Sequence, residues 1–328
     1  IRIGAACDGT LAQHATLRIP TGGLLPDGAD AVVPIEDVRV DGARAFVDRA
    51  VPAGDCVHPR GSDMRAGSTI VEPHRFIGAP ELGVLASLGI TAVPVFRRPR
   101  FAVISSGDEL VDPSAAPALG QIRDSNRWAI EGALRAFGAD VLHLPIVPDE
   151  IGAAAGTLRE ALAVCDGVIL TGGSSVGTRD LTPQTIDRLG GPGVIVHGLR
   201  VKPGKPTVFG AVEGKPIIGL PGNPASALII LIAVAEPIIA ALVGSRRPSP
   251  VVSGTLAKPF AKRAGWTWFV PVTIDETGKE AVIQPMEMHS GSVSLLARAD
   301  GFTRFDEAVT SLPAGSTVRA VRFFRGGM

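Results

Sequence analysis

The sequence predicts a multidomain α/β protein whose central part is a doubly wound, mostly parallel sheet. Between residues 99 and 245, short apolar runs alternate with segments of helical periodicity, which is typical of βαβ units. Residues 1–98 and 246–328 instead carry short extended runs punctuated by Gly and Pro. We therefore expect a β-rich N-terminal region with a helical connector (1–98), an α/β domain (99–245) and a small all-β C-terminal domain (246–328).

The N-terminal region combines expected strands with one helix. Residues 31–35 and 45–47 read as extended runs. Leu82, Leu85 and Ala86 recur at helical spacing, which predicts a helix near residues 80–88.

In the α/β domain each apolar run predicts a strand, and most strands are followed by a helical pattern. Ser125 is a candidate N-cap for a helix that Gly138 ends. The apolar stretch 225–243 is interrupted by Glu236 and Pro237, so it predicts a buried core helix and not a membrane span. The remaining expected elements are strands at 101–105, 141–147, 168–170 and 216–220, a helix at 151–164, and a helix face made by Ile130, Ala133, Leu134 and Phe137.

Composition and charge narrow the class of protein. The chain has 32 basic and 32 acidic residues, which gives no broad electrostatic basis for binding nucleic acid or a membrane. The three cysteines, Cys7, Cys56 and Cys165, are widely spaced and suit a reducing cytosol better than a disulfide framework. The six histidines show no zinc-binding spacing, and no signal-peptide pattern opens the chain. We expect a cytoplasmic protein.

Polar and glycine-rich segments follow the expected strands of the α/β domain. In open α/β sheets, ligands bind beyond the carboxyl ends of the strands. The segments at this edge are residues 105–109, Asp149, residues 171–177 with Asp180, and residues 221–224. The sequence therefore predicts one pocket that offers backbone amides, hydroxyls and carboxylates together.

The 171–177 loop suits a phosphate. Its glycines let backbone N–H groups approach an anion, and a helix follows from about Leu181, with Pro183 tolerated in the first turn. It is not a Walker loop, because G-x-x-x-x-G-K-[ST] is absent. The alternative interpretation is a tight strand-to-helix turn that binds nothing.

Charged side chains add candidate ligands. Lys202 and Lys205 stand on a stiff K-P-G-K-P turn and suit an oxyanion, although a solvated basic turn is the alternative. Four carboxylates, Asp63, Glu109, Asp149 and Asp180, are of the type that holds Mg²⁺. Each alone is also typical of a surface charge or a helix cap, and Asp149 stands just before an expected helix.

Taken together and in order, these segments resemble the molybdenum insertases, the molybdopterin molybdenumtransferase family that includes the gephyrin E domain. The motifs that carry the resemblance are R-I-P-T-G-G (18–23), G-A-D-A-V-V (28–33), R-G-S-D (60–63), S-S-G-D-E-L (105–110), D-S-N (124–126), T-G-G-S-S-V-G-T-R-D (171–180), K-P-G-K-P (202–206) and G-L-P-G-N-P (219–224). Each motif is weak alone, and their combination over nearly the whole chain is specific.

The resemblance implies a molybdopterin-binding-like fold for residues 99–245 and the last step of molybdenum cofactor synthesis. The enzyme would bind adenylylated molybdopterin, place molybdate on the dithiolene and release AMP with the help of Mg²⁺. It also implies a homodimer, with a molybdopterin adenylyltransferase as upstream partner. By the resemblance, the catalytic residues are Glu109, Asp149, Asp180, Lys202 and Lys205, and the metal ligands are Asp63, Glu109, Asp149 and Asp180. The cofactor-binding residues are Thr21, Ser106, Gly107, Thr171, Gly172, Gly173, Ser174, Ser175, Gly177, Pro221, Gly222, Asn223, Pro224, Ser290 and Ser292.

The chain departs from the family pattern in two places. Relatives carry an earlier M-D-G-Y-A segment that supplies an acidic residue, so we expect these 328 residues to lack part of the active site and to be the ordered part of a longer protein. Relatives also carry G-R-x-x-F-x-R, where this chain has G-W-T-W-F-V-P at 265–271. Trp266 and Pro271 thus replace two arginines of the molybdate subsite, and Arg263 is a candidate replacement.

Two other functions stay open at this point. A molybdopterin adenylyltransferase has the same central fold, and R-D-L-T-P at 179–183 resembles part of its motif, although Gly173 is followed by Ser174 and Ser175. A non-catalytic pterin-binding scaffold is the other alternative, suggested by Trp266 and Pro271.

Overall fold

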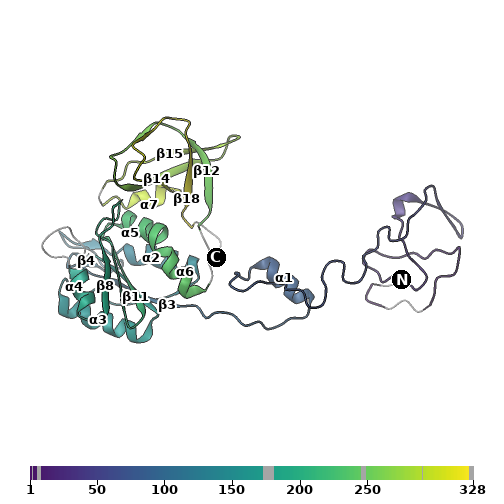
Figure 1. Ribbon diagram of the computed structural model, residues 1–328, viewed down its shortest axis with the longest axis horizontal. Helices are drawn as coiled ribbons and strands as arrows, with labels where there is room; N and C mark the ends of the chain where they lie inside the picture. Colours follow the sequence, from purple (N-terminus) through teal and green to yellow (C-terminus); the bar gives the residue numbers. More distant parts are fainter. Residues whose placement is uncertain (2, 6–8, 173–180, 245–248, 290, 325–328) are drawn as a thin grey trace. The chain divides into compact units, whose positions relative to one another are not determined.

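The computed structural model describes residues 1, 3–5, 9–172, 181–244, 249–289 and 291–324. The chain divides into two compact units, Ile1–Glu72 and Pro73–Met328 (Figure 1). Of the cysteines, Cys7 lies outside the described residues, and Cys56 and Cys165 are free thiols.

The first unit is built mainly of turns and irregular segments. Its regular elements are the 3-10 helix η1 (Ile35–Asp37) and the antiparallel hairpin of β1 (Val38–Asp41) and β2 (Arg44–Val47). The expected run at 45–47 is confirmed within β2, but the expected strand at 31–35 is wrong. Pro34 in that run has no N–H to donate to a ladder, and the Val32 N–H donates to the Asp55 carbonyl instead.

The second unit opens with α1 (Ala79–Ser87), which confirms the helix expected near 80–88. The Gly78 N–H donates to the Glu81 carboxylate at 3.0 Å, and this bond closes the first turn. Hydrogen bonds from the backbone N–H groups of Glu81 itself and of Gly78 hold the pKa of the Glu81 carboxyl below its usual value. Of the apolar face expected from the sequence, Leu85 is buried and Leu82 is exposed.

A six-stranded sheet forms the centre of the second unit, in the order β6-β3-β7-β11-β10-β8. The pairs β6–β3, β3–β7 and β7–β11 are parallel, while β10 pairs antiparallel with both β11 and β8, so only β10 runs against the others. This confirms the predicted mostly parallel sheet. The strands are β3 (Arg100–Ser105), β6 (Asp140–His143), β7 (Gly167–Thr171), β8 (Pro192–His197), β10 (Val208–Val212) and β11 (Lys215–Leu220).

Helices cover both faces of this sheet (Figure 1). Alternate residues of β3 point to opposite faces: Phe101 and Val103 join one core cluster, and Ala102 and Ile104 join the other. The first cluster contains α2 (Asn126–Phe137) and α5 (Pro224–Ile230), and the second contains α3 (Ile151–Val164) and α4 (Leu181–Asp187). Burial on both faces explains why these strands are continuous apolar runs.

Two expected elements of this domain differ from the structure. The strand expected at 141–147 ends at His143, because Pro145 cannot donate to a ladder, and Val147 keeps only an isolated bridge to Ser106. The core helix expected at 225–243 consists of α5, a π-helical turn at Leu231–Ala235 and α6 (Glu236–Val243). Pro237 lacks the N–H that would bond to the carbonyl of residue 233, which accounts for the π turn.

The segment Pro224–Val243 is long and apolar enough to cross a membrane by length and composition alone. Half of its most apolar stretch is buried, and Ile229, Ile230, Leu231 and Ile239 pack in the core beneath α2. The segment therefore packs as a core helix, which confirms the prediction from the sequence.

The C-terminal domain contains a closed five-stranded barrel, in which β15 pairs with both β12 and β14. Val270, Val272, Ile283 and Phe305 are among the residues of its core. Its strands are β12 (Val251–Leu256), β14 (Thr267–Asp275), β15 (Ala281–Pro285), β16 (Gly301–Phe305) and β18 (Thr317–Arg322). Smaller elements are β13 (Phe260–Ala261), β17 (Ser311–Leu312) and the short helix α7 (Ser294–Arg298), which the sequence did not predict.

The barrel and the six-stranded sheet share one hydrophobic core. Phe269, Phe302 and Phe323 of the barrel belong to the same cluster as Leu134 of α2 and Ile230 of α5. The barrel also takes in β9 (Val201–Lys202), which lies between β8 and β10 in sequence and pairs with β14. The position of β9 is therefore fixed by both domains.

Removing a side chain from the shared core should destabilise the second unit. Leu134 is fully buried, so Leu134→Ala should lower the free energy of unfolding by about 2–5 kcal/mol. Leu119 is fully exposed, so the matched variant Leu119→Ala should cost less than about 0.5 kcal/mol. Urea unfolding followed by circular dichroism measures both, and equal losses would contradict this core assignment.

An ion pair at the amino ends of β3 and β7 makes stability depend on acidity. Arg97 donates two hydrogen bonds to Asp166 at 2.7 and 2.5 Å, and the Arg100 N–H donates a third at 2.8 Å. The bonds from Arg97 lower the pKa of Asp166 from 3.8 to about 2. A lowered folded-state pKa adds stability that is present above pH 4 and is lost as the pH falls towards 2.

We therefore expect the stability difference between the wild type and Asp166→Asn to be largest near neutral pH and to shrink between pH 4 and pH 2. The stability difference between the wild type and Arg97→Gln should shrink over the same pH range, because this variant removes the main partner of the Asp166 carboxylate. Urea titrations across this pH range measure the effect. A difference that stays constant with pH would show that the carboxylate contributes nothing through its charge.

Candidate functional site

Three strand ends meet at the carboxyl edge of the six-stranded sheet, where the sequence predicts the pocket. The Ser106 N–H donates to the Thr171 carbonyl at 2.8 Å, which joins the ends of β3 and β7. Gly172 follows at φ +88°, and a Cβ at this position would lie 1.9 Å from the Ser106 carbonyl oxygen. Only glycine permits this approach of the two backbones.

The turn after β11 reaches the same place. A Cβ on Gly222 would lie 3.6 Å from the Gly172 Cα, so the two glycines are neighbours separated by about the space of one methyl group. The Asn126 side-chain amide donates to the Gly222 carbonyl at 2.8 Å and to the Thr171 hydroxyl at 3.5 Å. Asn126 therefore bridges the loops that follow β7 and β11. Its residue type and the D-S-N motif were the only signals for this role in the sequence.

Asp149 belongs to this edge. Its carboxylate accepts a hydrogen bond from the Ser106 hydroxyl at 2.6 Å, and its own N–H donates to the Asp108 carboxylate at 3.2 Å. The alternative that Asp149 caps the following helix is wrong, because Glu150 occupies the N-cap position of α3. Asp149 instead ties the loop before α3 to the end of β3.

Glu109 lies on the same loop as Ser106. Its carboxylate packs against Gly107, where a Cβ would lie 2.6 Å from the nearer oxygen. Glu109 is exposed, so its charge is available to a ligand. The structure thus brings together Ser106, Gly107, Asp149, Thr171, Gly172 and Gly222 among the predicted residues, with Glu109 beside them.

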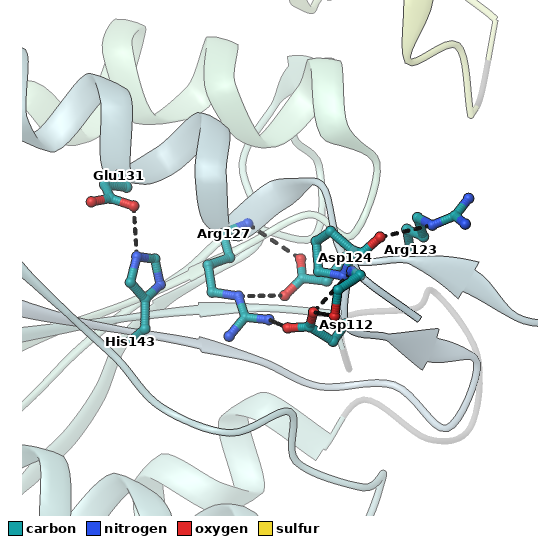
Figure 2. Close-up of polar contacts among 8 residues, drawn as sticks. Asp112, Arg123, Asp124, Arg127, Glu131 and His143 are labelled. Atoms are coloured by element: carbon teal, nitrogen blue, oxygen red, sulfur yellow. Dashed lines mark hydrogen bonds and ion pairs between the residues drawn. The ribbon is translucent and has the colours of Figure 1, made fainter. Parts of the chain in front are cut away.

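A buried ion pair holds the first turn of α2 at this edge (Figure 2). Arg127 contacts Asp124 at 3.2 Å and Asp112 at 3.5 Å, and Asp124 is buried. Ser125 stands at the N-cap position as expected, but its side chain makes no capping bond; the Arg127 N–H donates to Asp124 at 3.3 Å instead. Asn126 lies between Asp124 and Arg127 in sequence. The ion pair therefore fixes the backbone from which the Asn126 side chain reaches Thr171 and Gly222.

A second pair anchors the middle of α2 to the edge strand β6. The Glu131 carboxylate and the His143 ring nitrogen Nε2 are 2.6 Å apart (Figure 2), and Arg135 donates to the other Glu131 oxygen at 2.8 Å. These contacts set the rotation of α2 against the sheet.

The structure does not test several of the predicted residues, and it places three others beside Gly222. Gly173, Ser174, Ser175, Gly177, Asp180 and Ser290 lie outside the described residues. Thr21 and Asp63 are exposed residues of the first unit. Pro221 and Asn223 lie with Gly222 in the turn between β11 and α5, and Pro224 is the first residue of α5. Helix α4 begins at Leu181, with Pro183 in its first turn as predicted.

The K-P-G-K-P turn is stiff, as predicted, because Pro203 and Gly204 are buried. A Cβ on Gly204 would lie 2.2 Å from the Ile230 side chain, and its φ is +109°. Lys202 and Lys205 are both exposed. The Lys202 ammonium lies 4.1 Å from the centre of the Trp268 ring.

Lys202 and Trp268 line a cavity of about 490 Å³ on the barrel. Lys258 and His289 line it too, together with the apolar Phe260. A neighbouring cavity of about 380 Å³ shares Lys258 and His289 and contains the predicted residue Ser292. Neither Arg263 nor Trp266 lines either cavity. Lys258 and His289 are the other basic residues of the cavity that Lys202 lines, and Arg298 lines the neighbouring cavity.

Within the described ranges, no three His, Cys, Asp or Glu side chains lie close enough together to form a metal cage. Mg²⁺ is commonly held by one or two carboxylates together with substrate phosphates and waters. Glu109 and Asp149 are the predicted carboxylates at this edge that are of the type used in such a shared site.

Three family models match the chain in order. The model of the MoeA N-terminal region (domain I and II) matches residues 1–89, that of the probable molybdopterin binding domain matches 102–241, and that of the MoeA C-terminal region (domain IV) matches 253–323. The middle match contains the whole carboxyl edge described above.

Curated relatives match over most of their length. The molybdopterin molybdenumtransferase of Synechocystis sp. is 33% identical over 310 residues, which cover 92% of this chain and 76% of the relative. That of Haemophilus influenzae is 31% identical over 312 residues, with 93% and 76% covered. A solved structure of the molybdopterin biosynthesis moeA protein from Pyrococcus horikoshii matches with a TM-score of 0.80 and 31% identity, and covers 98% of this chain and 79% of that one.

Loss of the Asn126 bridge should loosen the edge without unfolding the sheet. Asn126→Ala leaves the Gly222 carbonyl without its donor, and we expect a loss of about 1–2 kcal/mol in stability. Hydrogen exchange of residues 221–224 should become faster, while exchange in β3 stays slow. Gln121→Ala, which removes one exposed hydrogen bond within a turn, is the control. Unchanged exchange at 221–224 in Asn126→Ala would show that the bridge is not needed.

Proposed function

The chain belongs to the molybdopterin molybdenumtransferase family, and from this premise we propose that it binds adenylylated molybdopterin at the carboxyl edge of the six-stranded sheet, transfers molybdate onto the dithiolene and releases AMP. Membership makes the chain a molybdenum insertase of molybdenum cofactor biosynthesis and a transferase. The proposal concerns the place of the pterin nucleotide, the fate of its AMP and the residues that act on them.

The convergence of the loops after β3, β7 and β11 is the observation that carries the proposal. The Ser106 carbonyl lies close to Gly172, and Gly222 is the neighbour of Gly172. The Ser106 hydroxyl meets Asp149 beside them. Glycine backbones let a phosphate approach N–H groups closely. The carboxylates of Asp149 and Glu109 accept hydrogen bonds, which suits the N–H donors of a pterin ring. One edge thus supplies both kinds of partner that a pterin phosphate needs.

In this proposal the K-P-G-K-P turn (202–206) and the cavity that Lys202 lines bind the oxyanions. Lys202, Lys205 and Lys258 have ammonium groups, which donate hydrogen bonds as point charges. The cavity beside Lys202 accepts molybdate in this proposal, and Lys258 and His289 take the place of the arginines that the G-W-T-W-F-V-P stretch lacks. The Lys205 ammonium meets a phosphate of the nucleotide.

Magnesium enters the proposal as an ion shared between protein and substrate. Glu109 and Asp149 hold it from the protein side, with Asp180 and Asp63 as further candidates from the family motifs. The ion would neutralise phosphate charge at the bond that releases AMP. The hydrogen bond from Ser106 keeps one Asp149 oxygen oriented, so the other stays available to a ligand.

We also propose a cytoplasmic homodimer that receives its substrate from a molybdopterin adenylyltransferase. Exposed apolar side chains are frequent from α1 to the start of β3, among them Leu82, Leu88, Ile90, Val95 and Phe96. Apolar surface of this kind marks protein–protein contacts. A second copy of the chain is the partner that we assign to it, and sedimentation of the purified protein measures the mass of the assembly.

Reaction of purified components tests the proposed activity. With adenylylated molybdopterin, molybdate and Mg²⁺, we expect molybdenum cofactor and AMP to form together. With molybdopterin and ATP instead, we expect no adenylylated product. Product only in the second mixture would assign the adenylyltransferase reaction to this chain. No product in either mixture, from protein that binds the pterin nucleotide, would favour a scaffold.

Lys205→Ala should weaken the binding of phosphate-containing ligands by about 1.5–3 kcal/mol, because it removes a charged hydrogen bond. Calorimetric titration with AMP and with adenylylated molybdopterin measures the loss. Lys279 is an exposed lysine outside both cavities, so Lys279→Ala should bind as the wild type does. Equal affinity of Lys205→Ala and the wild type would instead describe the turn as a solvated basic loop.

A further inference from the structure

We propose that Trp268 is a positioning residue for oxyanion binding: its indole face holds the Lys202 ammonium at the cavity and so raises the affinity of that lysine for molybdate or phosphate. The inference rests on the proposed function, which assigns Lys202 to an oxyanion. It adds Trp268, which stands at a position that the G-R-x-x-F-x-R motif leaves unspecified.

The two residues are opposite each other across a strand pair. Strands β9 and β14 are parallel, and Trp268 is the register partner of Lys202. The ammonium nitrogen lies 4.1 Å from the centre of the indole ring, well inside the range of a cation–π contact. Both side chains line the same cavity of about 490 Å³. The contact therefore places the charge at the cavity wall.

The indole ring is itself held by the barrel. Trp268 meets the ring of Phe260 edge to face at 6.2 Å between centres, and Phe260 stacks on Phe305 at 3.9 Å. Phe305 is buried in the barrel core and is the register partner of Trp268 on β16. An aromatic row thus runs from the core to Lys202. Its rigidity makes the indole a fixed platform, whereas the lysine side chain alone is flexible.

Holding the ammonium in this way favours anion binding for two reasons. The indole face restricts the rotamers of Lys202, so less side-chain freedom is lost when an anion binds. It also covers one side of the ammonium, so less water has to leave before the anion makes contact, while donors on the other side remain free.

The cavity is suited to an anion. Lys258 and His289 line it together with Lys202. Glu287 is the carboxylate among the lining residues, and it lies 3.8 Å from His289. In the part of the chain that the structure describes, neither Lys202 nor Lys258 has a carboxylate within ion-pair distance. Lys202 and Lys258 therefore bring two basic side chains to the cavity, and Trp268 fixes one of them.

Calorimetric titration of the full chain with molybdate, and separately with inorganic phosphate, tests the proposal. Trp268→Leu should weaken binding by about three- to tenfold, the range of a partly desolvated cation–π contact. Trp268→Phe keeps an aromatic face and should recover most of the affinity. In a Lys202→Ala background, Trp268→Leu should have no further effect. Trp128→Leu, on α2 and outside the cavity, is the matched control and should bind as the wild type does.

A second measurement reports on the contact directly. In the wild type, nuclear magnetic resonance should show the terminal methylene protons of Lys202 shifted upfield by the indole ring current. The shift should be lost in Trp268→Leu and partly kept in Trp268→Phe. This shift can be measured without an added ligand. If Trp268→Leu folds poorly, the smaller shift expected in Trp268→Phe still tests the contact.

The outcomes separate this inference from the proposed function. Wild-type affinity in Trp268→Leu, with weakened binding in Lys202→Ala, would overturn the role of Trp268 and leave Lys202 as an oxyanion ligand. An equal loss from Trp268→Leu with and without Lys202 would also overturn it, because the indole would then act without the lysine. Full affinity in Lys202→Ala would overturn the oxyanion role of Lys202 and the inference with it.

Discussion

Close packing of backbone at the carboxyl edge of the six-stranded sheet is the constraint on which the site depends. Gly172 lies so near the Ser106 carbonyl that any Cβ would push β3 and β7 apart, and a Cβ on Gly222 would in turn touch the Gly172 Cα. Across these neighbouring loops Asn126 reaches both Thr171 and Gly222. The loop after β3 lies where Asp149 accepts a hydrogen bond from Ser106. Polar groups that are far apart in sequence thereby come to face one ligand.

Two further contacts relate this edge to the rest of the second unit. The buried pair of Asp124 and Arg127 holds the first turn of α2, and removing one partner of such a pair leaves an uncompensated charge. On the other side, β9 carries Lys202 into the barrel, while the residues before and after it return to the sheet. Because barrel and sheet share a core through Phe302, the oxyanion turn is held firmly beside both.

Much of the fold follows from the sequence, and less of the site does. Strands buried on both faces, such as β3 and β7, are continuous apolar runs and were predicted, whereas the edge strand β8 exposes Ile195 and Val196 and was not. The glycine loops and Asp149 were placed at the edge by the general rule for open α/β sheets. The bridge by Asn126 joins residues 45 and 96 positions away, and the Trp268–Lys202 contact depends on strand register between two domains. No local pattern encodes such pairings.

Hydrogen–deuterium exchange of the full chain with and without adenylylated molybdopterin tests the central claim most directly. If the pterin nucleotide binds at the carboxyl edge, the amides of residues 105–109, 147, 149–150, 171–172 and 222–223 should become protected on binding, and their protection should increase with ligand occupancy. Because this readout follows binding and not turnover, it is independent of metal and molybdate. Protection confined to the barrel, with the four loops unchanged, would contradict the account.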